Sequence, residues 1–446
     1  MSAVNRAARG WAVVASAVVL AVAGCSSSGS AGGQSGSSGA PSSPAASPAG
    51  GDSTSSAGTG GGDCGTALKV GIVTAFTGEL GDFGKTSKEG FDFAVKQIKD
   101  SGQLPKGWSI ETKEGDGKTD PQEALRVATS MVENDKVSAI LGPSSGPIMA
   151  MVKLSERYQI PIISQFAGTV NLDTVGGKWL YRTVASDTSD GLAAAKWLSE
   201  KGAKKVVMLV QNDESTVSPA KVMEKTFTDA GGTVVASVKY NAGQPSYQTI
   251  VQQAIDAKPD AIFLAGGQES GVTIVKELLA AGYSSDQILT TADMAVPDVI
   301  KAIGAKQAEG LQTETPSSDD SRPQYQAFAK AFKADLGHAP DLFVANAYDA
   351  MTLVALAAVA AKSTCGADIN AHLREVSGAP GTKVDSFADG VKALAAGEDI
   401  DFEGASGPVD FDKTGTVAGS YAILKVTNGQ WKQATFYPAE DFLAGS

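Results

Sequence analysis

The stretch Gly142-Pro143-Ser144-Ser145-Gly146-Pro147 sets two serines among glycines and prolines. Its first five residues fit G-x-S-x-G, the turn that exposes a catalytic serine in α/β-hydrolases. The same residues suit a glycine-rich turn that opens a helix and binds an anion through backbone N–H groups. A plain helix cap is the third interpretation. The stretch by itself leaves acyl transfer, anion binding and capping open.

Partners for catalysis are few in this chain. It has two histidines, His338 and His372, and neither has a neighbour at metal-ligand spacing, so we expect no metal and no cofactor. Both histidines follow Ser144, in the chain order that a serine hydrolase requires. Pro143 and Pro147 fix φ on both sides of the serines and disfavour the strained nucleophile turn. A secreted hydrolase with Ser144 as nucleophile therefore stays as the alternative.

A second glycine-rich stretch, at residues 78–86, resembles a phosphate-binding loop. That loop needs four residues between its glycines, whereas five separate Gly78 from Gly84. Glu79 and Asp82 inside it would also repel a phosphate. We therefore exclude nucleotide binding at this stretch.

The N-terminus has the features of an export signal. Arg6 and Arg9 precede an apolar run at residues 11–22, which leads through small residues into Cys25. This arrangement resembles the lipobox of bacterial lipoproteins, which predicts a signal peptide at 1–24 and a lipidated Cys25. Residues 26–62 consist almost entirely of Ser, Gly, Ala, Pro and Thr, which predicts a disordered tether. We expect an extracytoplasmic protein that is lipid-anchored to the outer face of the cell membrane.

Charge and cysteine content narrow the partners. Removal of 1–24, with its two arginines, takes the formal net charge from −12 to −14. Such an acidic body argues against nucleic acid, whose phosphates need Lys and Arg. With Cys25 assigned to lipid, Cys64 and Cys365 remain as a pair in an oxidising compartment, so we predict that they form a disulfide.

From residue 67 onward, short β-branched runs alternate with helical patterns in two successive blocks. This alternation predicts an α/β fold of two doubly wound lobes with parallel sheets. A strand is expected at 137–141 and a helix at 147–158, so the serines lie at the carboxyl end of a strand, where ligands of such sheets bind. Later predictions are helices at 324–336 and 342–362 and strands at 407–411, 419–426 and 431–436, the last two joined by an Asn428-Gly429 turn.

Several stretches together resemble one family, the type I periplasmic solute-binding proteins of ABC importers, in particular the branched-chain amino-acid-binding (leucine/isoleucine/valine) group. The stretches are VGIVTAFTG at 70–78 and FG at 83–84, ILGPSSG at 140–146, IPIIS at 160–164, and FEGASGPV at 402–409 followed by FD at 411–412. The resemblance implies two lobes joined by a three-strand hinge, at 67–186 plus 314–408 and at 187–313 plus 409–446. It also implies a non-enzyme that captures a small amino-acid-like solute and delivers it to the permease and ATPase subunits of the importer. A ligand-binding sensory module remains a further alternative.

The resemblance also implies site residues. Ser145, beside Ser144, would hold a ligand carboxylate, and Asp293 of the other lobe would hold an ammonium group. Backbone groups at Phe166 and Gly168 would contact the ligand, with Thr169 in place of the hydroxyl that the family often has at the Gly168 position. Phe83 corresponds to the aromatic residue of the first loop, and Gln268 and Tyr348 complete the predicted contacts. The family's second-lobe aromatic residues are absent at 211–216 and 266–269, so the sequence leaves the ligand undefined within the class of amino acids, small carboxylates and amides.

Overall fold

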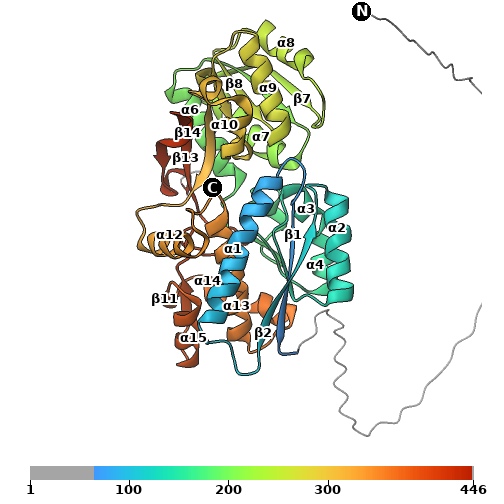
Figure 1. The fold of residues 1–446 in the computed structure, drawn as a ribbon, viewed down its shortest axis with the longest axis vertical. Coiled ribbons are helices and arrows are strands. Elements are labelled where there is room, and N and C mark those ends of the chain that lie inside the picture. The colour runs from blue at the N-terminus through green and yellow to red at the C-terminus, as the bar shows by residue number, and fades with distance from the viewer. Residues whose placement is uncertain (1–64, 444–446) are drawn as a thin grey trace, which may run out of the picture. The chain divides into compact units, whose positions relative to one another are not determined.

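The computed structural model describes residues 65–443 as two α/β lobes, each built on one β-sheet (Figure 1). We call residues 65–185 and 318–418 lobe 1, and residues 186–317 and 419–443 lobe 2. The chain passes between the lobes three times, near residues 185, 317 and 418. This arrangement confirms the predicted α/β fold.

The first sheet is parallel throughout and belongs to lobe 1. The elements of this lobe are β1 (Ala67–Thr74), α1 (Gly81–Asp100), β2 (Ser109–Asp116), α2 (Pro121–Ser130), η1 (Met131–Asp135), β3 (Ala139–Leu141), α3 (Ser145–Ala150), α4 (Val152–Tyr158), β4 (Ile162–Ser164), α5 (Leu172–Val175), β5 (Leu180–Arg182), α12 (Pro323–Leu336), α13 (Val344–Ala361), α14 (Gly366–Ser377), β11 (Thr382–Val384), α15 (Phe387–Ala395) and β12 (Ile400–Phe402). The strand order is β2-β1-β3-β4-β5, and β11 pairs separately with β12.

The second sheet is parallel at its centre and antiparallel at one edge. The elements of lobe 2 are α6 (Asp187–Glu200), β6 (Lys205–Gln211), α7 (Glu214–Asp229), β7 (Thr233–Tyr240), α8 (Gln248–Asp256), β8 (Ala261–Ala265), α9 (Gln268–Ala280), η2 (Ser285–Gln287), β9 (Ile288–Thr290), η3 (Ala292–Met294), α10 (Pro297–Ile303), α11 (Ala305–Ala308), β10 (Gln312–Ser317), β13 (Ser420–Thr427), β14 (Gln430–Tyr437) and α16 (Glu440–Leu443). The strand order is β14-β13-β10-β9-β8-β6-β7. The Asn428-Gly429 hairpin is confirmed, since β13 and β14 are antiparallel and both turn residues have positive φ.

The alanine-rich helix α13 forms the centre of lobe 1. It lies beside α1, in blue and orange in Figure 1, and its buried face shares one apolar cluster with β1. Close approach needs Gly90 of α1, because a Cβ there would come within 2.3 Å of the Val344 carbonyl oxygen. By length and hydropathy α13 could cross a membrane, but 72% of its apolar window is buried inside the protein. It is a core helix of lobe 1.

Three predicted features differ from the structure. The prediction of a strand at 407–411 is wrong, since the structure has only an isolated bridge between Glu403 and Pro408. The N–H groups of Ala405 and Ser406 donate to the Asp349 carboxylate and not to a neighbouring strand. The helix at 147–158 begins earlier, at Ser145, and is divided at Met151 into α3 and α4. Strand β10, which the prediction divided between the lobes at residue 313, pairs in the second sheet as far as Ser317.

The predictions for the N-terminal region lie outside the described residues. These are the signal peptide at 1–24, the lipidated Cys25, the tether to residue 62, and Cys64 as partner of Cys365. The first described residue, Gly65, accepts a hydrogen bond of 2.9 Å from Thr364 Oγ1. The described chain therefore begins directly beside the residue that precedes Cys365.

Candidate ligand site between the lobes

Lobe 1 contributes two neighbouring loops to a small cavity. Ser144 and Ser145 follow β3, and Phe166 and Gly168 follow β4, so the parallel pairing of these strands brings both loops to the same sheet edge. Ser145 is the first residue of α3 and is 1% exposed. The N–H groups of a first helical turn have no acceptor within the helix, so this loop offers donors together with two hydroxyls.

Lobe 2 and the crossovers close the other side. Asp293 lies in η3, directly after β9, and Asp187 and Asp190 lie in the first turn of α6. The cavity has a volume of about 40 Å³ and is lined by Leu80, Ser144, Ser145, Phe166, Gly168, Val184, Ala185, Asp187, Asp190, Ser215, Thr291, Ala292, Asp293, Pro316, Phe343 and Tyr421. It is therefore enclosed by both lobes and by two of the three crossovers.

The structure brings together five of the nine residues predicted to contact a ligand. These five line the cavity: Ser144, Ser145, Phe166, Gly168 and Asp293. Phe83 lies one layer behind, with its ring 5.3 Å from that of Phe343.

The other three predicted contacts lie elsewhere. Thr169 Oγ1 donates a 2.6 Å hydrogen bond to Glu214 of lobe 2, and Gln268 begins α9 outside the cavity lining. Tyr348 packs inside lobe 1, with its ring 5.0 Å from that of Phe328. Thr169 and Tyr348 therefore contact other protein groups instead of the cavity.

Sequence reasoning missed the acidic side chains in the cavity, Asp187 and Asp190, and Glu314 beside it. Asp187 and Asp190 stood in a predicted helix start, where acidic residues are ordinary. Glu314 belongs to β10, whose polar sequence gave no strand signal, yet the side chain is fully buried. Only the arrangement of the crossovers shows that all three lie next to Asp293.

Burial changes the acidity of these groups. Burial, together with Asp213, Asp187 and Glu79, raises the pKa of Asp293 to about 8. Burial also raises the pKa of Asp187 to about 7, against the opposing effects of Ser218 and Arg182. The carboxyl groups of Asp190 and Glu314 lie against each other, and burial raises both pKa values well above the ordinary range. Near neutral pH the site can therefore gain or lose protons when a ligand arrives.

Gly168 explains the absence of a hydroxyl at this position. A Cβ at residue 168 would lie 1.8 Å from Asp187 Oδ1. The Asp187 N–H also donates to the Gly168 carbonyl over 2.7 Å. The space that a serine or threonine side chain would take is thus filled by a carboxylate from the first crossover.

Hydrogen bonds across the cleft hold the lobes in contact. Glu214 of lobe 2 accepts from Thr169 and from Asn171 Nδ2 of lobe 1, at 2.6 and 2.7 Å. In the opposite sense, Glu79 of lobe 1 accepts from the Glu269 N–H at the start of α9, at 3.2 Å. Two carboxylates, one from each lobe, therefore act as latches on the closed arrangement.

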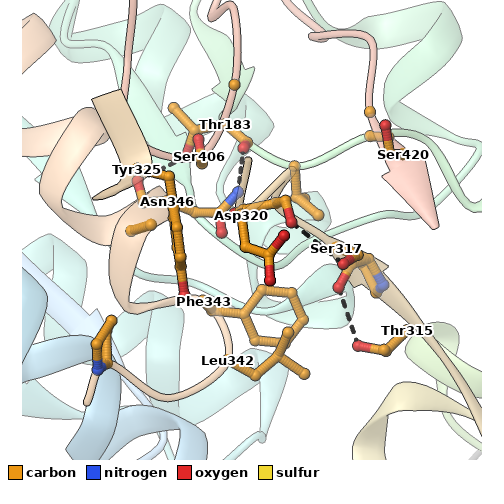
Figure 2. Close-up of a pocket in the computed structure, with 18 of the residues that line it drawn as sticks. Thr183, Thr315, Ser317, Asp320, Tyr325, Leu342, Phe343, Asn346, Ser406 and Ser420 are labelled. Atoms are coloured by element: carbon orange, nitrogen blue, oxygen red, sulfur yellow. Dashed lines mark hydrogen bonds between the residues drawn. The ribbon is translucent and has the colours of Figure 1, made fainter. Parts of the chain in front are cut away.

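A larger cavity of about 400 Å³ lies at the hinge, apart from the predicted site. All three crossovers line it, through Thr183, Ser317 and Ser420, and Figure 2 shows Asp320 projecting between Asn346 and Ser317. Val184, Ala185, Pro316 and Phe343 line both cavities, so these side chains form the wall between them. In the smaller cavity, hydroxyls of one lobe face carboxylates of the other.

Neither histidine takes part in this site. His338 is exposed and lies 3.7 Å from Glu89, and His372 lies 3.7 Å from Glu375, on helix α14. Ser144 therefore has no histidine beside it to take its proton. Within residues 65–443 no group of three or more His, Cys, Asp or Glu side chains is arranged to hold a metal ion.

Solved structures and known proteins share this fold. The structure superposes on a leucine-binding protein from Thermotoga maritima with a TM-score of 0.72 at 23% identity, covering 84% of this chain and 99% of that one. A solute-binding protein from R. palustris in complex with benzoate gives a TM-score of 0.68 at 22% identity, covering 83% and 97%.

Similar sequences agree with these structures. The Leu/Ile/Val/Thr/Ala-binding protein of Pseudomonas aeruginosa is 24% identical over 290 residues, which cover 65% of this chain and 77% of that protein. The Leu/Ile/Val-binding protein of Escherichia coli is 25% identical over 286 residues, covering 64% and 77%. The family model described as periplasmic binding protein matches residues 67–430, and the chain therefore belongs to the periplasmic binding protein family.

Proposed function

We propose that this protein captures a small amino-acid-like solute between its lobes and delivers it to the permease of an ABC importer. The observation that carries the proposal is the cavity itself, where Ser144 and Ser145 of lobe 1 face Asp293 of lobe 2. A solute with one anionic and one cationic end matches these two sides. Closure around it would be a hinge motion driven by higher ligand affinity in the closed state.

The proposed roles follow from the groups present. The hydroxyl of Ser145, helped by Ser144, donates to the ligand carboxylate, and Asp293 accepts from the ligand ammonium. Phe166 and Phe343, whose ring centroids lie 5.8 Å apart, form an apolar wall. Water excluded from this closed space strengthens each charge-assisted hydrogen bond.

Ligand binding is tested by thermal shift and calorimetry with a panel of amino acids, amides and aromatic acids. A true ligand at 100 times its Kd should add about 2.7 kcal/mol to the free energy of unfolding. Ser145→Ala and Asp293→Asn should each weaken binding about ten- to a hundredfold, because each removes a hydrogen bond to a charged group. Asp229→Asn, at the exposed end of α7, is the control and should bind normally. Unchanged affinity in both site variants would contradict the proposed site.

The hydrolase alternative is checked in the same preparation. Esterase turnover that is abolished by Ser144→Ala would overturn the binding function. We expect none, since both histidines lie away from Ser144.

The proposal includes anchoring through Cys25 by the lipobox-like sequence. Mass spectrometry of the mature N-terminus should find an acylated Cys25, and Cys25→Ser should release the protein from membranes. An unmodified N-terminus at another residue would contradict the anchor. A sensory role is distinguished by uptake: deletion should abolish uptake of the ligand if the protein serves transport.

A further inference from the structure

The cleft holds more carboxyl groups than a zwitterion can pair. Three carboxylates line the cavity, those of Asp187, Asp190 and Asp293, and its lining contains no lysine or arginine. A zwitterionic amino acid brings one positive and one negative charge. Its ammonium group would pair with Asp293 and leave the two carboxyl groups of α6 without a partner on the ligand.

Two buried polar atoms around the cavity have no partner. Asp187 Oδ2 and Thr291 Oγ1 are buried and have no hydrogen-bond partner within residues 65–443. Asp187 is 7% and Thr291 3% exposed, and both line the cavity. Asp190, 6% exposed, also lines the cavity and shares a hydrogen bond with Glu314. Buried polar groups are normally paired, so unpaired acceptors that face a ligand cavity indicate donors on the ligand.

The protein's own nearest cation is already engaged. Arg182 is fully buried and pairs with Asp173, and its guanidinium also donates to the Gly168 and Thr169 carbonyls and to Thr416 Oγ1. It lowers the pKa of Asp187 only as a secondary influence. Arg182 therefore fixes the Gly168 loop and leaves the cavity acidic.

The walls of the cavity suit an organic cation. Phe166, Phe343 and Tyr421 line it, and aromatic faces attract cationic groups. The carboxylates do not meet in a metal-ligand arrangement within the described residues. Because residue 168 is glycine, the Asp187 carboxylate can occupy the space that a side chain would otherwise fill. The backbone at residue 168 therefore positions this acidic group in the cavity.

We propose that the ligand is an organic cation with two ammonium- or guanidinium-type groups, namely a basic amino acid or a short diamine. One cationic group binds Asp293, and the second binds Asp187 and Asp190. A carboxylate, where the ligand has one, binds Ser145. This inference rests on the proposed function and names the substrate class of the same cleft.

The affinity of the cleft for a dication should depend on pH, because its acidic groups titrate. Titratable groups from both lobes surround Asp187, Asp190 and Asp293. Lobe 1 contributes Arg182, Asp173 and Glu79. Lobe 2 contributes Asp213 and Glu214 at the start of α7, Glu314 of β10 and Tyr421 of β13. All of these except Arg182 and Tyr421 are acids, and desolvation dominates each raised pKa. A dication binds the ionised carboxylates, so its affinity should increase at least fivefold from pH 5.5 to pH 8. A ligand that instead uses protonated Asp187 or Asp190 as hydrogen-bond donors would lose affinity as the pH rises from 5.5 to 8.

The first experiment compares ligands on the purified protein by calorimetry. Ornithine, lysine, arginine and putrescine are measured against leucine, valine, benzoate and calcium chloride. At least one dication should bind about tenfold or more tightly than leucine at pH 7.5. Stronger binding of leucine or benzoate would overturn the inference and keep the proposed function, and stronger binding of calcium would replace the organic cation. Failure of every organic solute would contradict the proposed function itself.

Variants separate the second cation subsite from the ammonium site. Asp187→Asn and Asp190→Asn should weaken the dication about ten times more than they weaken leucine, since each removes a charge-assisted bond to the second cationic group. Asp229→Asn is the matched control on an exposed helix end. Both site variants should also raise the Tm of the unliganded protein at pH 8, because they remove a buried carboxylate. Equal weakening of leucine and dication would contradict a separate subsite.

Discussion

At the scale of the residue, Gly168 determines the chemistry of the cavity. Its lack of a side chain lets Asp187 approach to a distance at which a Cβ would clash. A carboxylate acceptor therefore lies where a serine or threonine at residue 168 would have placed a hydroxyl donor. The acidic group and the glycine act together, so neither is interpretable alone.

The raised pKa values predict how stability depends on pH. Asp187 and Asp293 have folded-state pKa values of about 7 and about 8, against an unfolded value near 4. The folded protein therefore binds more protons than the unfolded chain between these values, and its stability decreases as pH rises from about 4 to 8. We expect the Tm without ligand to decrease from pH 5 to pH 8 in calorimetry. Asp187→Asn should flatten this slope, whereas Asp229→Asn should not; an unchanged slope in Asp187→Asn would contradict the assigned pKa.

At the scale of the element, helix α13 organises the closing loop of lobe 1. Asp349 is fully buried on this helix and accepts from the Ala405 and Ser406 N–H groups and from Ser406 Oγ, at 2.8, 2.7 and 2.6 Å. Burial raises its pKa to about 6, while these bonds hold it lower than burial alone would. One carboxylate thereby replaces the strand pairing that the loop lacks.

Loss of this carboxylate should therefore be costly. Asp349→Ala leaves three donors unpaired, one buried and two partly buried, and should reduce the free energy of unfolding by about 3 kcal/mol. Urea denaturation measures the change. Asp399→Ala, at an exposed position next to β12, should stay within about 0.5 kcal/mol of the parent. Similar values for the two variants would mean that the loop is held by its apolar contacts.

At the scale of the whole molecule, two glutamate side chains, which we call the latches, connect the lobes through hydrogen bonds. Glu214 and Glu79 each accept hydrogen bonds from the opposite lobe. Neither glutamate belongs to the cavity lining, although their neighbours Leu80 and Ser215 do. They therefore bias the hinge equilibrium and leave the ligand contacts unchanged.

Removal of a latch should open the cleft. Glu214→Ala deletes the bonds to Thr169 and Asn171, so we expect a larger radius of gyration in solution scattering of the unliganded protein. Ligand affinity should decrease about three- to tenfold, because closure then draws on more of the binding energy. Glu224→Ala, on the same helix and without a side-chain hydrogen bond in the structure, is the control. A scattering profile equal to that of the parent would contradict a latch at Glu214.

Much of the fold could be predicted because its signals are local. The alternation of β-branched runs with helical spacing predicted most strands and helices of both lobes. The Asn428-Gly429 turn predicted the hairpin of β13 and β14. Strand β10 escaped prediction because its sequence QTETPS is polar although the strand is buried. Its burial depends on neighbours from distant parts of the chain, which no local pattern records.

The sequence by itself determined the two-lobed α/β class, the serine loop after β3 and Asp293 after β9, since a strand end and its loop are adjacent in the chain. Only the tertiary structure decided what faces them. The first crossover brings Asp187 and Asp190 to the cavity, Glu314 lies against Asp190, and the Gly168 gap admits the Asp187 carboxylate. The acidity of a site depends on the distances and burial of charges far apart in sequence, and folding alone fixes those distances.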